Sequence, residues 1–159
     1  MRLSPVVAAF AAVLIAGAAP EPTVDFTLSP VMGAGGLEAL DVEMRTLGEA
    51  DGETEILLPD HWASETDLVR QVTDLHITGG AVTAPTPSSR VVRHRPGAHL
   101  VVRYRLVSGY PADPPHGNPY RPIVRPGWFH VVGEAAFPRP AWDDRTPARF
   151  HWRGWPKGW

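Results

Sequence analysis

The sequence predicts a mainly β protein, a sandwich or an open barrel-like antiparallel sheet of about seven to nine strands after a cleaved signal peptide. Three observations predict this fold: an apolar segment confined to the N-terminus, short stretches in which apolar and polar residues alternate, and turn residues at regular intervals. Since no internal repeat or change of composition divides the chain, we expect a single domain.

The N-terminal segment has the layout of a secretory signal peptide. Arg2 is followed by an apolar run over 6–17, and Ala16-Gly17-Ala18 has the small residues that a signal peptidase recognises. The alternative is an uncleaved membrane anchor, but the run is shorter than the ~20 residues of a spanning helix and no second run follows. We therefore expect residues 1–19 to be removed and residues 20–159 to form one β domain, exported to the periplasm or the extracellular space with no membrane span.

Charge and cysteine content exclude several classes of protein. The chain has 15 basic and 17 acidic residues and a formal net charge of −2, which argues against a nucleic-acid partner. It has no cysteine, so it can form neither disulfide bonds nor the lipid-modified cysteine of a bacterial lipoprotein. The roughly 140 residues left after signal removal can bury a sizeable core without disulfides.

The alternation of apolar and polar residues predicts where the strands lie. Apolar and polar residues alternate over 24–28, 40–46, 54–58 and 99–107, which is typical of strands with one buried face. In the last of these segments one face carries Leu100, Val102, Tyr104 and Leu106, and the other carries Val101, Arg103, Arg105 and Val107. Further strands are expected over 91–95, 128–132 and 149–153, and over 69–78, where a helix over 64–72 is the alternative.

Turn residues separate these strands. Asp51-Gly52 and Pro96-Gly97 predict two hairpins, and the sequence over 84–89 predicts a loop. The segment 110–126 contains six prolines, which cannot donate to a sheet, so we expect a surface excursion or an edge segment. The chain closes with an aromatic tail over 150–159.

No catalytic or metal-binding motif is recognisable. None of the seven histidines belongs to a His-Glu-x-x-His sequence, and Gly-x-Ser-x-Gly and phosphate-binding glycine loops are absent. His94 and His99 could face each other across the Pro96-Gly97 hairpin as half of a metal site, although two exposed sheet histidines are the simpler interpretation. Asp143 and Asp144 point apart on an extended chain, which argues against paired catalytic acids. We expect no cofactor, no bound metal and no enzymatic activity.

Aromatic residues are the main candidates for a binding role. Trp152, Trp155 and Trp159 crowd the C-terminal tail, where little chain follows to cover them, so we expect an interface there. The occupant would be a peptidase catalytic domain or a second copy of the chain; alternatively, the tail folds back and seals the end of the sheet. Four other aromatics could face a ligand: Trp62, Tyr110, Tyr120 and Trp128.

Several segments together resemble a known family. They are the Leu-Pro-Asp-His-Trp segment within 57–63, the strand over 68–77, the Val-Val-Arg-Tyr-Arg-Leu strand within 100–107, and the closing aromatic segment 152–159. This pattern is similar to the N-terminal β domain of the M61 glycyl aminopeptidase family, in which such a domain leads into a thermolysin-like zinc domain. The chain departs from the family at Ala63-Ser64-Glu65-Thr66, where members carry Pro-Gly-Ser-Tyr.

The resemblance implies a non-catalytic support domain, whether as a natural short protein or a truncated family member. Because the zinc-binding helix of the family would follow the β domain, no metal ligand or general base is carried over to a residue of this sequence. The alternative function is an envelope or secreted binding module that holds carbohydrate or peptide with surface Trp and Tyr side chains.

Overall fold

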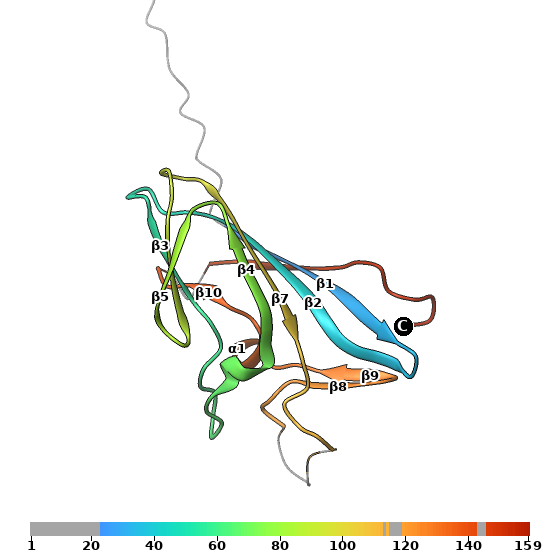
Figure 1. Ribbon diagram of the computed structural model, residues 1–159. Helices are drawn as coiled ribbons and strands as arrows, with labels where there is room; N and C mark the ends of the chain where they lie inside the picture. The colour runs from blue at the N-terminus through green and yellow to red at the C-terminus, as the bar shows by residue number, and fades with distance from the viewer. Residues whose placement is uncertain (1–22, 113, 115–118, 143–145) are drawn as a thin grey trace, which may run out of the picture.

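The computed structural model describes residues 23–112, 114, 119–142 and 146–159 (Figure 1). The expected signal peptide and Asp143-Asp144 lie outside these residues. Within them the chain forms eleven strands, of which eight have five residues or more and three are shorter. The expectation of a mainly β fold is therefore confirmed. No helix of the described part has the length and apolar character that crossing a membrane would need.

The strands form two large sheets and one small one. The five-stranded sheet has the order β11-β1-β2-β7-β4, and its members are β1 (Val24–Gly33), β2 (Gly36–Leu47), β4 (Val72–Thr78), β7 (His99–Leu106) and β11 (Ala148–Trp152). The four-stranded sheet has the order β10-β3-β6-β5, with β3 (Glu53–Leu57), β5 (Ala81–Thr86), β6 (Ser89–Arg93) and β10 (Arg139–Pro140). A separate hairpin joins β8 (Ile123–Arg125) to β9 (Trp128–His130).

The core lies between the two large sheets, as in a β-sandwich. Alternating residues of β1, β2 and β7 meet Ile56 of β3 and Val92 of β6 in one buried cluster. The predicted faces of 40–46 and 99–107 are confirmed, because the side chains of each predicted inner face are buried while Asp41 and Arg103 face outward. Tyr104 belongs to the buried face, and its hydroxyl donates a 2.8 Å hydrogen bond to the carbonyl oxygen of Ala136. Burial raises the pKa of this phenol well above its usual range.

The two predicted hairpins are wrong, because Asp51-Gly52 and Pro96-Gly97 carry the chain from one sheet to the other. β2 and β7 belong to the five-stranded sheet, whereas β3 and β6 belong to the four-stranded sheet. Positive φ angles of 88° at Gly52 and 67° at Gly97 allow these tight crossings. The two turns lie together at one end of the sandwich, where the His94 N–H donates to the carbonyl oxygen of Gly52.

Three other segments differ from expectation. The predicted loop 84–89 contributes to β5 and β6, and Pro85 is tolerated there because β5 is an edge strand. The segment 64–72 contains only a four-residue 3-10 helix, η1 (Leu68–Gln71), before β4 begins. The Pro-rich segment ends in β8, whose Ile123 and Val124 are buried. One short α-helix, α1 (Gly133–Ala136), follows β9.

Candidate functional site

The aromatic tail begins as a strand that pairs in parallel with the first strand of the domain. In the register of β11 with β1, Phe150 lies beside Phe26 and Trp152 lies beside Leu28. The rings of Phe26 and Phe150 stack with centroids 5.1 Å apart and planes 12° apart, and Phe137 contacts both. The tail is thus tied to the core through a pair of residues that are far apart in the sequence.

The β8–β9 hairpin completes an aromatic surface with this tail. The ring of Phe129 on β9 lies 6.0 Å from that of Trp152 and 5.4 Å from that of Trp155, and Trp155 lies 5.3 Å from Trp159. Trp128, which precedes Phe129, lines a groove with Phe129 and Trp159. We call these five residues the aromatic rim: Trp128, Phe129, Trp152, Trp155 and Trp159.

Three members of the aromatic rim are widely exposed. Trp128 and Trp159 are each 46% exposed and Trp152 is 59% exposed. A groove runs between the hairpin and the end of the chain, lined by Pro126, Gly127, Trp128, Phe129, Gly158 and Trp159. Exposed apolar surface of this kind usually marks a binding site.

Trp155 differs from the other tryptophans of the tail. It is half-buried against the core, and its indole Nε1–H donates a 3.1 Å hydrogen bond to the carbonyl oxygen of Leu28. The backbone N–H of Arg153 donates to the same carbonyl at 3.0 Å. The tail therefore folds back through Trp155, whereas Trp152 and Trp159 remain on the surface.

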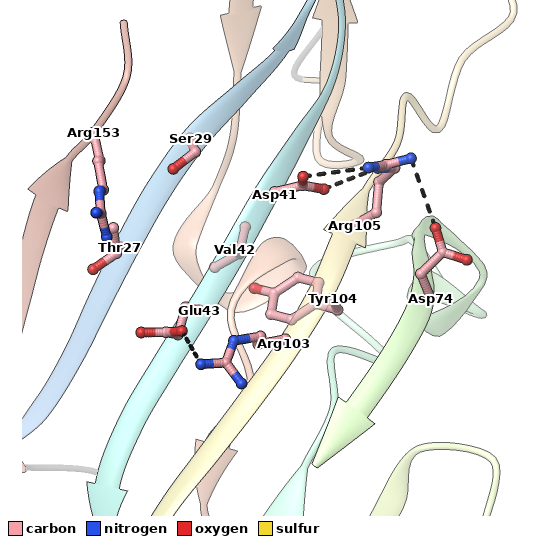
Figure 2. A pocket seen from close by; sticks show the side chains of 10 residues that line it. All are labelled: Thr27, Ser29, Asp41, Val42, Glu43, Asp74, Arg103, Tyr104, Arg105 and Arg153. Carbon is pink, nitrogen blue, oxygen red and sulfur yellow. Dashed lines mark hydrogen bonds and ion pairs between the residues drawn. The ribbon is translucent and has the colours of Figure 1, made fainter. Parts of the chain in front are cut away.

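The outer face of the five-stranded sheet carries paired charges (Figure 2). Asp41 lies directly across from Arg105, and Glu43 directly across from Arg103, with N–O distances of 2.9 and 2.6 Å. Burial alone would raise the pKa of the Glu43 carboxyl, but hydrogen bonds from Arg45 and Arg103 outweigh it and lower that pKa. Since each of these carboxylates already has a cationic partner, this face has the character of a solvated sheet surface.

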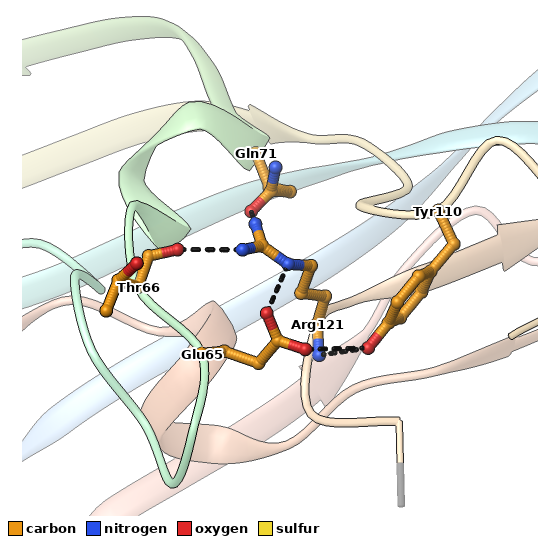
Figure 3. A network of polar contacts seen from close by, with 5 residues as sticks. All are labelled: Glu65, Thr66, Gln71, Tyr110 and Arg121. Carbon is orange, nitrogen blue, oxygen red and sulfur yellow. Dashed lines mark hydrogen bonds and ion pairs between the residues drawn. The ribbon is translucent and has the colours of Figure 1, made fainter. Parts of the chain in front are cut away.

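A second polar network ties the turn after β3 to the segment before β8 (Figure 3). Arg121 Nε lies 2.6 Å from Glu65 Oε2, and its guanidinium also donates to Gln71 Oε1 and to the carbonyl oxygen of Thr66. The Tyr110 hydroxyl donates to Glu65 Oε1 at 3.3 Å. These contacts fix a loop rather than present groups to a ligand.

The four aromatics predicted to face a ligand are not gathered at one place. Trp62 is 38% exposed and pairs through its backbone with Glu65 in a tight turn. Tyr110 joins the network around the same glutamate, Tyr120 is half-buried, and Trp128 belongs to the aromatic rim. Of the four, only Trp128 lies among the exposed residues of the rim.

His94 and His99 do not face each other, because the chain changes sheets between them. His94 Nε2 lies 2.8 Å from Thr54 Oγ1 and Nδ1 lies 2.7 Å from the carbonyl oxygen of Arg95, so both ring nitrogens are engaged. Burial and the nearby Asp51 raise the pKa of Glu49, and His94 acts in the opposite direction. Among the described residues, no group of three or more His, Asp or Glu side chains is placed to hold a metal ion.

The sequence analysis did not identify Phe129 as part of the aromatic surface, nor Glu65 and Arg121 as an ion pair. Phe129 could have been identified, because it lies beside Trp128 in a predicted strand. The ion pair could not, because Glu65 and Arg121 are 56 positions apart and neither belongs to a motif.

Comparisons with known proteins find similar structures but no similar sequence. No protein-family model and no curated protein sequence matches this chain. An aminopeptidase N family protein from Idiomarina loihiensis is similar in structure, with a TM-score of 0.45 and 14% identity over 57% of this chain and 16% of that chain. A two-domain M1 zinc metallopeptidase bound to L-tryptophan is similar with a TM-score of 0.33 and 20% identity over 65% of this chain and 24% of that chain.

The chain thus spans less than a quarter of either peptidase. Both similar structures are described as aminopeptidase N or M1 peptidases, and neither shows the expected relation to the M61 family.

Proposed function

We propose that this chain is a non-catalytic, exported β domain that docks through its aromatic rim, in the manner of the N-terminal support domain of an M61-type zinc aminopeptidase. The partner is a peptidase catalytic domain or a second copy of the chain. The observation that carries the proposal is the exposure of three tryptophans, Trp128, Trp152 and Trp159. Ring contacts link Trp152 and Trp159 through Trp155, and Trp128 and Trp159 line one groove.

Physical chemistry supports a docking role for this surface. Burying a large aromatic side chain contributes on the order of 2–3 kcal/mol, so covering two or three of these indoles would stabilise a complex substantially. Trp is also enriched among the residues that dominate protein interfaces. The rim is held in place from below, because Trp155 is bonded to β1 and Phe150 stacks on the core. Such a preorganised surface loses little conformational entropy on binding.

The groove between Trp128 and Trp159 favours one other function, a binding module for carbohydrate or peptide. Two indoles beside the small residues Gly127 and Gly158 could stack on a sugar ring or on a proline. A soluble oligosaccharide or Pro-rich peptide that quenches tryptophan fluorescence, with the effect lost in Trp128→Ser, would favour this alternative.

Sedimentation equilibrium of the exported protein tests the docking role. We expect the average mass to rise with concentration, because isolated copies will cover their rims with one another. The double change Trp128→Ser and Trp159→Ser should restore the monomer and leave the thermal transition within a few degrees, since both side chains are exposed.

The matched control is Val82→Ser, because Val82 is 41% exposed on the other sheet, at its β5 edge. This change should leave the self-association intact. A wild-type protein that stays monomeric at every concentration, or a control that abolishes association equally well, would contradict self-association through the rim.

A further inference from the structure

β11 leaves an open edge on the five-stranded sheet. It pairs with β1 on one side, and all five of its residues are exposed. The carbonyl oxygen of Pro147 accepts from Val24 N–H and the Arg153 N–H donates to Leu28, each at 3.0 Å. Because backbone groups alternate in direction along a strand, the N–H and C=O groups of the even-numbered residues 148, 150 and 152 point away from β1. They form a row of donors and acceptors available for a further strand.

The inner side of this edge is apolar and incompletely covered. Phe150 stacks on Phe26 and contacts Phe137, yet 46% of its surface is exposed. Trp152, two positions further on the same face, is 59% exposed. A neighbouring strand with apolar side chains on this face would extend the core over both rings.

The outer side of the same strand is basic. Arg149, His151 and Arg153 alternate with the aromatic residues. His151 Nε2 lies 3.4 Å from Asp25 Oδ1, whereas neither arginine makes an ion pair within the described part of the chain. In the register with β1, Arg149 lies across from Asp25, the carboxylate that contacts His151. In the middle of the same sheet, arginines of β7 lie directly across from carboxylates of β2 and form ion pairs with them. Asp25 lies on the β1 side, so within the described part of the chain no carboxylate pairs with Arg149 or Arg153 from the free side of β11.

A second copy of the chain is a poor occupant for this edge. Antiparallel pairing of two β11 strands about His151 would place Arg149 directly across from Arg153 on both sides of the axis. Like charges at directly opposed positions destabilise a sheet. The basic residues therefore disfavour pairing between copies and favour an acidic partner.

We propose that the free edge of β11 accepts one more strand from an extended partner segment in which acidic and apolar residues alternate. The acidic residues would lie beside Arg149, His151 and Arg153, and the apolar residues beside Phe150 and Trp152. Main-chain hydrogen bonds supply affinity in this mode of recognition, and the alternating side chains supply specificity. The inference rests on the proposed docking role and names the chemistry of the partner.

Labelled synthetic peptides test this inference by fluorescence anisotropy with the exported protein. The probe is a capped peptide with Glu and Val in alternation. One control has the same composition with the Glu and Val residues in separate blocks, one has Lys in place of Glu, and one is the alternating peptide with N-methylated backbone amides. We expect the alternating Glu–Val peptide to bind at least tenfold more tightly than each control, and to weaken as salt is added.

Charge reversal distinguishes recognition from a structural role. Arg149→Glu combined with Arg153→Glu should invert the preference, so that the alternating Lys–Val peptide binds more tightly than the Glu–Val peptide. Strand addition would be overturned if the block peptide or the N-methylated peptide bound as tightly as the alternating Glu–Val peptide. Self-association of the wild type that the charge-reversed variant alters would point to a second copy at this edge and would also overturn it.

The result of the peptide-binding experiment can be distinguished from the result of the self-association experiment. Trp128→Ser with Trp159→Ser leaves β11 unchanged, so the variant should still bind the alternating peptide. A monomeric wild type that binds the peptide would refute self-association through the rim and support the edge, whereas a self-associating wild type that does not bind the peptide would refute the edge alone.

Discussion

Replacing Trp155 by Ser is expected to lower the free energy of unfolding by roughly 2–4 kcal/mol. The indole is half-buried against the core, contacts Phe129, Trp152 and Trp159, and donates a hydrogen bond to Leu28. Its loss removes apolar contacts and leaves the C-terminal end of the tail with little to hold it against β1. Urea unfolding followed by far-UV circular dichroism measures the change.

Trp159→Ser is the matched control for this prediction. The residue type and the substitution are the same, but Trp159 is 46% exposed and its ring contacts only Trp155 among the described aromatic side chains. We expect it to change the free energy of unfolding by less than about 1 kcal/mol. Equal losses from the two variants would contradict the different roles that the structure gives these tryptophans.

Replacing Arg121 by Met is expected to lower the free energy of unfolding by about 1–3 kcal/mol. The change leaves the Glu65 carboxylate, which is 24% exposed, without its ion-pair partner and removes the hydrogen bonds to Gln71 and Thr66. Because the network closes the turn at Trp62, limited proteolysis should also cut this turn faster in the variant. Urea unfolding at neutral pH and the rate of proteolysis are the two measurements.

Arg70→Met provides the control within the same region. Arg70 forms an ion pair of 3.4 Å with Asp67, but the two side chains are 75% and 61% exposed. Solvent-exposed pairs of this kind contribute little, so the free energy of unfolding should change by less than about 0.5 kcal/mol. If Arg70→Met destabilised the domain as much as Arg121→Met, the burial of the Glu65–Arg121 pair would not explain its effect.

The faces of individual strands could be predicted because they depend on local alternation. Along β7, and along β2 from Leu40 onward, each buried residue is followed by a more exposed one, and this period of two is visible in the sequence. The expected strand over 149–153 corresponds to β11 at Ala148–Trp152.

The division of the strands between sheets could not be predicted. Asp51-Gly52 and Pro96-Gly97 have the local chemistry of tight turns whether the next strand stays in the sheet or crosses to the other. The choice depends on how β2, β3, β6 and β7 bury their apolar faces together, which is a property of the whole core.

The aromatic rim was anticipated in part. Its tryptophans were recognised because the C-terminal segment is dense in aromatic residues, but the sequence does not distinguish Trp155 from Trp159. That distinction arises from the parallel pairing of β11 with β1, which joins Phe26 to Phe150 across most of the chain. Contacts of such long sequence separation leave no periodic signal in either segment.

Hydroxyl-radical footprinting tests the central claim, that the aromatic rim is covered by a partner, most directly. Oxidation of each tryptophan would be measured by mass spectrometry in the dilute purified protein and in the protein as it occurs in its own compartment. The account predicts that Trp128, Trp152 and Trp159 react rapidly in the dilute protein and are at least severalfold protected in the native setting, while Trp62, outside the rim, reacts equally in both. Rim tryptophans that react at the same rate in both samples would contradict a docking role for this surface.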